Sequence, residues 1–343
     1  MTETAELESE VRTLLEQGDL DAAIEFLNNR HPAEVGGVID ELDGETAYAL
    51  FDQLDRRTQA RILPYMQPSH QLSMVQHLSR HAQARLLTDM NADERADLYQ
   101  ELPEDVQEAL MPALAKAERE DLLRLTSYPE GTVGSVMTSE YATVPAHISA
   151  RQAIERLRLQ ALNKETIYVA YVLDTERHLL GIVTLSGLVV ASPGESVEDL
   201  MQTEVVNVHT DAPSAEAARL IADYDLLAVP VVDDEDRMVG IVTHDDAMDV
   251  QEAEATEDIH KGASVGDLPG SLKETALTTL YQKRIMWLVL LVFANVFSGA
   301  SISLYEDTIQ AHVGLVFFLP LLIASAGNAG SQSATLMVRA IAT

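Results

Sequence analysis

The stretch VGSVMTSEYATVP at residues 133–145 has a counterpart in VEDLMQTEVVNVH at residues 197–209, and this pair decides how the chain is organised. A second matched pair follows, LLGIVT at residues 179–184 and MVGIVT at residues 238–243. Two related segments that recur in the same order indicate an internal duplication. Because the matched segments are rich in β-branched residues and lie between turn-forming residues, each copy is predicted to contain strands.

Each copy is predicted to read strand, helix, strand, strand and helix. The predicted helices are Ala150–Leu162 and Ser214–Tyr224, and the strands that precede each GIVT segment are VAYVLD (169–174) and VPVVDD (229–234). This pattern resembles a pair of cystathionine β-synthase (CBS) domains, which stack head to tail as a regulatory module. The resemblance implies one CBS domain at residues 131–196 and a second at residues 197–260.

Upstream of the duplication, apolar residues repeat every 12 positions. The register positions are Leu42, Leu54, Met66, Leu78, Met90, Leu102 and Leu114, and their partners nine positions later are Phe51, Leu63, Val75, Leu87, Tyr99 and Met111. Residues that commonly begin helices recur just after the register position, namely Asp43, Asp55, Ser79, Asn91 and Pro103. Such short repeats predict an all-α superhelical domain at residues 1–130.

Two stretches near the C-terminus lack Asp, Glu, Lys and Arg, from Ile285 to Tyr305 and from Thr308 to Val338. Each exceeds the roughly 20 apolar residues that a helix needs to cross a bilayer. They predict a partial transmembrane domain at residues 285–343, with spans at about 285–305 and 313–338. The alternative is a pair of buried core helices, although such helices usually keep a polar face.

Charges flanking these stretches set an expected orientation. Lys283 and Arg284 precede the first stretch, Glu306 and Asp307 separate the two, and Arg339 follows the second. This distribution agrees with the positive-inside rule, and the acidic N-terminus does not read as a signal peptide. We therefore expect a multi-pass protein of the cell membrane with cytoplasmic N-terminal domains. A connecting helix at residues 261–284, which includes a Gly/Pro interruption at 262–270, would link the α/β units to the bilayer.

Composition narrows the possible partners. A net charge of -32 argues against nucleic acid, because phosphate contacts need Lys and Arg. The absence of cysteine excludes thiolate metal sites and leaves carboxylates, His and carbonyls as ligands. Two explanations of the acidity stay open, adaptation to a high-salt cytoplasm and binding of divalent cations. No phosphate loop, nucleophile elbow or His-metal spacing occurs, so an enzyme is not expected.

Several carboxylates are spaced to share a helix face. Asp93 and Asp97 in MNADERADLYQEL (90–102) lie one turn apart, and a second group follows the duplicated unit: Asp246, Asp249, Glu254, Glu257 and Asp258. Two carboxylates 4 Å apart repel by about 4 kcal/mol at an effective dielectric near 20. A hard dication such as Mg²⁺ would offset this repulsion. The alternatives are a solvated acidic helix for the second group and acids that stabilise a helix dipole for the first.

The segment PLLIASAGNAGSQSATLMVRAIAT (320–343) places polar and small residues where lipid would favour apolar atoms. It looks like the second transmembrane helix of the MgtE family of magnesium channels and transporters, whose G-N-x-G-x-Q-S-A-T pattern lies at the ion pathway. The resemblance implies the following pore-lining residues: Gly327, Asn328, Gly330, Gln332 and Thr335. Ala326 departs from the more usual glycine.

The MgtE resemblance extends over essentially the whole chain. It implies that Mg²⁺ is both substrate and regulator, and that acids at Asp93, Asp97, Asp246 and, with a weaker match, Asp225 share Mg²⁺ between the helical domain and the CBS pair. High cytosolic Mg²⁺ would then close the ion path. The family works as a homodimer with five transmembrane helices, so three helices are expected either from a longer chain or from another polypeptide.

CBS pairs commonly bind adenine nucleotides through a Thr-x-x-Asp motif that follows the GIV strand. The second copy keeps this motif as Thr243 and Asp246, whereas the first copy has Thr184 and Gly187 in the matching places. One site for ATP or another adenine nucleotide is therefore expected in each chain. The alternative function is a membrane-anchored CBS regulator that senses a nucleotide or metal and has no transport activity of its own.

Overall fold

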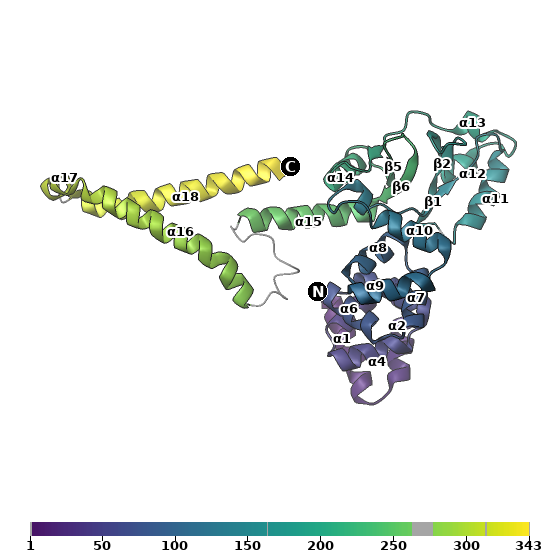
Figure 1. The fold of residues 1–343 in the computed structure, drawn as a ribbon, viewed down its shortest axis with the longest axis horizontal. Helices are drawn as coiled ribbons and strands as arrows, with labels where there is room; N and C mark the ends of the chain where they lie inside the picture. Colours follow the sequence, from purple (N-terminus) through teal and green to yellow (C-terminus); the bar gives the residue numbers. More distant parts are fainter. Residues whose placement is uncertain (1, 163, 263–276, 313, 343) are drawn as a thin grey trace. The chain divides into compact units, whose positions relative to one another are not determined.

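The computed structural model describes residues 2–162, 164–262, 277–312 and 314–342, which form two compact units, Met1–Met248 and Asp249–Thr343 (Figure 1). The larger unit begins with a helical domain: α1 (Thr2–Glu16), α2 (Leu20–Asn28), α3 (Pro32–Asp40), α4 (Gly44–Gln53), α5 (Arg56–Ile62), η1 (Leu63–Tyr65), α6 (Pro68–His77), α7 (Arg80–Asp89), α8 (Ala92–Glu101), α9 (Glu104–Leu110), η2 (Met111–Ala113) and α10 (Lys116–Leu125). An α/β part follows: η3 (Val133–Ser135), β1 (Tyr141–Thr143), α11 (Ala150–Gln160), β2 (Thr166–Leu173), β3 (Leu179–Thr184), α12 (Leu185–Val190), α13 (Val197–Leu200), β4 (Val208–His209), α14 (Ser214–Asp223), β5 (Ala228–Val232), β6 (Met238–Thr243) and α15 (His244–Gly262), whose first residues belong to the larger unit.

The 12-residue repeat of the helical domain corresponds to one short helical segment and two extended residues at the corner, the first of which is the register residue. Leu54 ends α4 with φ -67° and ψ 149°, and Leu78 ends α6 with φ -75° and ψ 150°. Both side chains are buried, at 4% and 6% exposure. The next helix begins at once, with the Asp55 carboxylate accepting from the amides of Arg57 and Thr58. The register residues therefore lie at the buried corners between helices, and the predicted superhelix of brief helices is confirmed.

The duplicated unit forms two sheets of the same topology. In the first, β1 pairs in parallel with β2, and β2 pairs antiparallel with β3. In the second, β4 pairs in parallel with β5, and β5 pairs antiparallel with β6. Equivalent strands keep equivalent registers, since Val169 is opposite Thr184 and Ala228 is opposite Thr243. The strand order predicted from the two repeats is confirmed.

The two copies exchange backbone hydrogen bonds reciprocally. Thr138, at the entrance to the first copy, donates to and accepts from Ile241 in β6 at 2.8 and 2.9 Å. Gln202, at the entrance to the second copy, makes the same pair of bonds with Ile182 in β3, both at 2.9 Å. Each copy thus supplies the segment that covers the last strand of the other copy.

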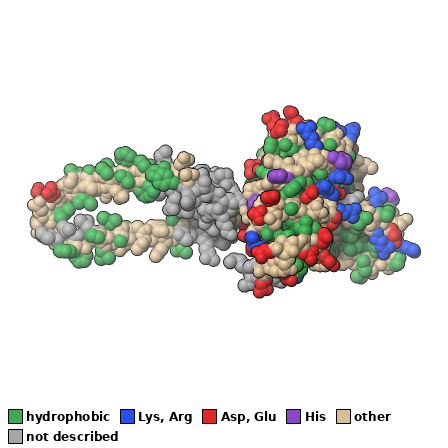
Figure 2. Space-filling model, turned by 90° about the horizontal axis from the view of Figure 1, so that it is seen from below, with side chains coloured by type: hydrophobic (Ala, Val, Ile, Leu, Met, Phe, Trp, Pro, Cys, Tyr) green, Lys and Arg blue, Asp and Glu red, His purple; other side chains and the backbone are tan. Residues whose placement is uncertain are grey.

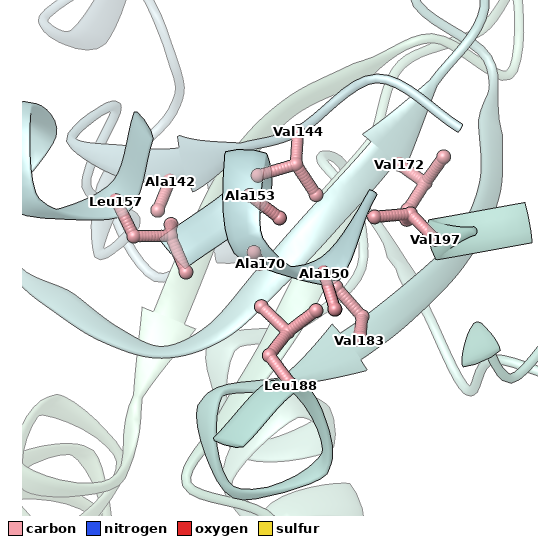
Figure 3. Packing of buried hydrophobic residues seen from close by; sticks show 10 residues of the cluster. All are labelled: Ala142, Val144, Ala150, Ala153, Leu157, Ala170, Val172, Val183, Leu188 and Val197. Carbon is pink, nitrogen blue, oxygen red and sulfur yellow. The ribbon is translucent and has the colours of Figure 1, made fainter. Parts of the chain in front are cut away.

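Small and β-branched side chains fill the core of the first copy, as Figure 3 shows. Ala150, Ala153 and Leu157 on α11 face Ala170 and Val172 on β2, and all five are almost fully buried. Such compact side chains let the helix approach the sheet closely. A separate cluster joins the copies and includes the buried residues Tyr141, Tyr171, Ala228, Met238 and Ile241.

The smaller unit contains α16 (Leu277–Ser303), α17 (Glu306–Ala311) and α18 (Gly314–Ala342). Among the residues that the structure describes, no helix has both the length and the apolar character required of a membrane span. The two spans expected at about 285–305 and 313–338 are therefore not borne out. The predicted interruption at 262–270 lies almost wholly outside the described residues, as does most of the connecting segment before Leu277.

Candidate cation-binding site

Helix α8 contributes three carboxylates of the helical domain to the candidate site. Asp93 and Glu94 lie in its first turn, where the helix dipole favours negative charge, and Asp97 follows one turn later. The spacing puts Asp93 and Asp97 on the same face. Leu98 and Tyr99 are buried in the domain core, so the helix is held with a fixed orientation.

The α/β part contributes carboxylates at the start of α15. The hydroxyl oxygen of Thr243, the last residue of β6, lies 2.5 Å from both Asp245 Oδ1 and Asp246 Oδ2. The Thr243 amide also donates to Asp246 Oδ2 at 3.3 Å. One hydroxyl has one proton to donate, so the two carboxylates compete for it.

The carboxylates of α8 and α15 influence one another strongly. Burial, followed by the charge of Asp97, raises the pKa of Asp93 to about 6. Burial and the charge of Asp246 raise the pKa of Asp97 to about 6, although Asp97 keeps contact with solvent. Burial and the charge of Asp93 raise the pKa of Asp246 to about 7. The structure therefore brings together three of the acids that the sequence indicated.

The group also contains acids that were not predicted from the sequence. Burial and the Asp93 charge raise the pKa of both Glu94 and Glu165 to about 8, and burial also raises the pKa of Glu140. We call the whole set the interdomain acidic cluster: Asp93, Glu94, Asp97, Glu140, Glu165, Asp245 and Asp246. The sequence does contain a signal for two of these acids, because Glu140 directly precedes β1 and Glu165 directly precedes β2. The two strands are parallel, so both acids lie at the same end of the sheet. The Glu165 amide donates to the Glu140 carbonyl at 2.8 Å.

Two oxygen atoms of the cluster lack partners. Asp93 Oδ1 and Glu165 Oε2 are buried without a hydrogen bond. Buried polar atoms without partners are costly, and several desolvated carboxylates together cost more. A small, hard dication that prefers oxygen ligands and retains some water would satisfy these atoms and neutralise the repulsion. These donor types suit Mg²⁺, although within the described part of the chain no three of these acids have ligand atoms within 4.8 Å of one another.

The remaining metal candidates lie on other parts of the chain. Asp225 lies in the turn after α14 with a φ of 51°, and its side chain is exposed. Asp249 and Glu254 are exposed on the part of α15 that belongs to the smaller unit. Glu257 and Asp258 lie farther along the same helix. Their roles as ligands stay predictions.

The five predicted pore-lining residues all lie on α18: Gly327, Asn328, Gly330, Gln332 and Thr335. Gly327 and Gly330 have no neighbour within 4 Å of an added Cβ, and Asn328 and Gln332 are exposed within the described part of the chain. Side chains left open in this way are available to other helices or to an ion path. Their pore-lining role stays a prediction.

The two candidate nucleotide residues are in direct contact, through the Thr243 hydroxyl and the Asp246 carboxylate. In the first copy, Thr184 has a different partner, since its hydroxyl oxygen accepts from the Gly187 amide at 3.0 Å and caps α12. The copies therefore differ as the sequence indicated. Asp246 belongs both to this pair and to the interdomain acidic cluster.

A different trio, His209, Asp211 and Asp234, has potential ligand atoms within 4.8 Å of one another. The Asp211 amide donates to His209 Nδ1 at 3.2 Å, and His209 Nε2 lies 3.1 Å from Asp234 Oδ1. A neutral ring with its proton on Nε2 satisfies both contacts. Coordination through Nε2 would move that proton to Nδ1 and break the first bond. The ring nitrogens of His209 are therefore both used in contacts within the trio, which joins the end of β4 to the loop after β5.

Comparison with known families gives matches to both parts of the larger unit. The MgtE intracellular N domain matches residues 30–131, and the CBS domain matches residues 133–194 and 197–253. Among solved structures, the soluble part of a magnesium transporter is similar with a TM-score of 0.68 and 29% identity, over 74% of this chain and 99% of that one. The cytosolic domain of the Mg²⁺ channel MgtE in complex with ATP gives 0.67 and 35%, over 71% and 99%.

Curated relatives agree with these matches. The magnesium transporter MgtE of Thermus thermophilus is 38% identical over 333 residues, which are 96% of this chain and 74% of that protein. The MgtE protein of Bacillus subtilis is 38% identical over 218 residues, which are 63% of this chain and about half (48%) of that protein. The helical domain, the CBS pair and the likeness over nearly the whole length together show that this chain belongs to the MgtE family of magnesium transporters.

Proposed function

We propose that this chain is a subunit of a Mg²⁺ transporter or channel, in which the helical domain and the CBS pair sense intracellular Mg²⁺. The observation that carries the proposal is the interdomain acidic cluster, whose buried oxygens Asp93 Oδ1 and Glu165 Oε2 have no partner. The cluster draws its acids from both domains, so a bound dication stabilises their contact. When Mg²⁺ is scarce, repulsion among the acids opposes that contact.

Mg²⁺ would act on the ion path by binding the joined arrangement more tightly than the separated one. Asp246 is important in this account because it lies at the first turn of α15, the helix that leaves the CBS pair. A cation that bridges α8 and Asp246 would therefore fix the start of α15. We propose that the fixed state is the closed one, reached when intracellular Mg²⁺ is high.

Mg²⁺ transport by the full-length protein tests this function. Mg²⁺ uptake into proteoliposomes would be followed with a Mg²⁺-sensitive dye at several internal Mg²⁺ concentrations. Asp246→Asn is expected to keep uptake high at internal concentrations that close the wild type. The matched control is Glu198→Gln, an exposed carboxylate of α13 outside the cluster. Equal inhibition of Asp246→Asn and wild type by internal Mg²⁺ would contradict the sensor role.

We further propose that the chain lies in the cell membrane with its N-terminal domains in the cytoplasm. Two observations support this placement: the charge-free stretches at 285–305 and 308–338, and the naming of its relatives as transporters. Figure 2 shows acidic side chains at many places on the visible face of the larger unit. Proteolysis of sealed, inside-out vesicles should remove the helical domain and the CBS pair, whereas right-side-out vesicles should protect them.

A homodimer is the proposed assembly. Large apolar side chains of the CBS pair are exposed in the single chain, including Leu162 at 91%, Val190 at 86%, Val189 at 67% and Tyr224 at 57%. Contiguous apolar patches commonly mark an interaction surface, and Val189 and Val190 are neighbours in the chain that are both exposed. Light scattering of the purified full chain would give the mass of a dimer if the proposal is correct.

The second candidate is a membrane-anchored CBS regulator that senses a nucleotide or metal and transports nothing. The contact between Thr243 and Asp246 favours it, because this pair keeps the motif expected for a nucleotide, and one similar structure is described as a complex with ATP. ATP titration of wild type and of Asp246→Ala would test the nucleotide site. Nucleotide binding without any Mg²⁺ flux would favour this candidate over transport.

A further inference from the structure

Asp121 on α10 joins three donors from different parts of the chain. Its Oδ2 atom accepts from the Ser139 hydroxyl at 2.7 Å and lies 3.4 Å from an Nη atom of Arg95. Its Oδ1 atom accepts from Arg124 at 2.6 Å. Charge-assisted bonds of this kind are stronger than neutral ones. Asp121 thus ties α8 and α10 of the helical domain to the segment that enters the first CBS domain.

Arg124 extends this connection to the second CBS domain. Its other Nη atom donates to the Val239 carbonyl at 2.9 Å, near the start of β6. The same strand ends at Thr243, which contacts Asp246. The exchange of bonds between Thr138 and Ile241 holds β6 from another side. A continuous set of bonds therefore runs from Asp121 to the CBS side of the interdomain acidic cluster.

Arg95 connects Asp121 to the helical side of the cluster. It lies on α8 between Asp93 and Asp97, and its side chain is only 5% exposed. Its Nε atom is buried without a partner. The charge of Arg95 also reaches the cluster, since it favours the ionised form of Glu140. A guanidinium released from Asp121 would therefore have Glu140 as the acid of the cluster on which its charge already acts.

We infer that Asp121 is a positioning residue of the Mg²⁺ sensor. It holds the α8 carboxylates in place against Asp246, and it keeps the Arg95 guanidinium from occupying the place of the cation. The inference rests on the proposed function, because it assigns a role in tuning the same site. Loss of the Asp121 charge would both loosen the contact between the domains and supply the cluster with an internal competitor for Mg²⁺.

The test measures how the helical domain moves relative to the CBS pair as Mg²⁺ is added. The chain has no cysteine, so two spin labels can be placed at exposed positions, Gln53→Cys on α4 and Thr175→Cys in the turn after β2. Pulsed dipolar spectroscopy is done on the full chain in lipid nanodiscs, diluted with unlabelled chain. It gives the Mg²⁺ concentration at which half of the change in the distance between the labels has occurred, called the half-way Mg²⁺ concentration. The matched control for Asp121→Asn is Glu120→Gln, whose exposed carboxylate only approaches Lys116 at 3.5 Å.

Asp121→Asn is expected to raise the half-way Mg²⁺ concentration by about tenfold, which corresponds to about 1.4 kcal/mol. Glu120→Gln is expected to change it by less than about twofold, as for an exposed ion pair. Adding Arg95→Gln to Asp121→Asn should restore most of the wild-type value, because the competing guanidinium is gone. If Asp121→Asn does not fold, Arg124→Gln replaces it and should shift the value in the same direction.

The outcomes separate the two proposals. A wild type whose distances ignore Mg²⁺ would overturn the sensor itself. A wild type that responds, together with an Asp121→Asn variant that behaves like Glu120→Gln, would overturn only the role of Asp121. A shift that Arg95→Gln leaves wholly in place would overturn the role of Asp121 in keeping the Arg95 guanidinium away from the cation, because a merely structural loss has no reason to be rescued by removing a second charge.

Discussion

Replacing Glu165 by Gln should stabilise the protein when Mg²⁺ is absent and weaken its response when Mg²⁺ is present. Burial, with the charge of Asp93 next, raises the pKa of Glu165 from its ordinary 4.5 to about 8. The unfolded chain at neutral pH keeps this carboxylate ionised, whereas the folded chain without a cation must take up a proton. Folding therefore carries a cost that a neutral Gln of the same shape avoids.

The size of this cost follows from the two pKa values. A carboxyl group with a raised folded pKa costs nothing below its unfolded pKa, and the cost grows as the pH rises toward the folded pKa. At about 1.36 kcal/mol per pH unit, the cost is about 3 kcal/mol at pH 7 and about 1 kcal/mol at pH 5.5. For a unit of this size, about 3 kcal/mol corresponds to a rise of about 6–12 °C in the unfolding midpoint.

The assay is thermal unfolding of the full chain at pH 5.5 and pH 7, with chelator or with excess Mg²⁺ at matched ionic strength. With chelator, Glu165→Gln should unfold at a higher temperature than wild type, and the difference should shrink at the lower pH. With Mg²⁺, wild type should gain more than the variant, because the variant has lost one oxygen ligand. Glu198→Gln, which removes an exposed carboxylate of the same α/β part, should follow wild type throughout.

Two results would refute this reasoning. If Glu165→Gln lowers the unfolding midpoint in chelator at pH 7, the carboxylate is stabilised by a partner rather than destabilised by burial. If the difference from wild type is the same at both pH values, it does not come from the protonation of Glu165. Either result would remove the argument that the cluster is costly without a cation.

Three further predictions concern other parts of the chain. Mg²⁺ binding at pH 7 should release protons, because the cluster is partly protonated, and calorimetry in two buffers should find fewer released by Asp246→Asn. Val190→Glu, at an 86% exposed position, should shift the mass measured by light scattering from dimer to monomer. Gly240→Ala places a Cβ 2.9 Å from the Thr138 carbonyl oxygen and should destabilise the fold by about 1–3 kcal/mol, whereas Gly194→Ala, with open space around it, should leave the unfolding midpoint unchanged.

Much of the fold could be predicted because its signals are local or repeated. The segments at 133–145 and 197–209 resemble each other, so one interpretation had to fit both. The helix starts at Asp43, Asp55 and Ser79 follow from side chains that accept bonds from nearby amides. The sequence does not predict where the register residues lie in the fold, because a period of 12 fits both the buried face of a helix and a corner between helices. Leu54 lies at a corner.

The candidate site was only half predictable. Asp93 and Asp97 share one helix, so their spacing alone places them on one face. Glu140 and Glu165 enter the same cluster through the pairing of β1 with β2 and through the packing of the helical domain on the CBS pair. The sequence indicates the first contact only through the positions of these acids just before the two strands, and it does not indicate the second. The bonds of Asp121 to Arg95 and Ser139 depend on the same packing. Nothing in the sequence distinguishes Asp121 from the other acids in a chain with 55 of them.

The reciprocal bonds between the entrance of one CBS copy and the last strand of the other have a consequence for how the pair folds and how it could be divided. A single copy produced alone would leave β3 or β6 with open amides and carbonyls along one edge. Such an edge readily recruits a strand from another molecule. In the duplicated pair, each copy covers the open strand of the other and so protects it from aggregation. The two copies should therefore unfold in one step.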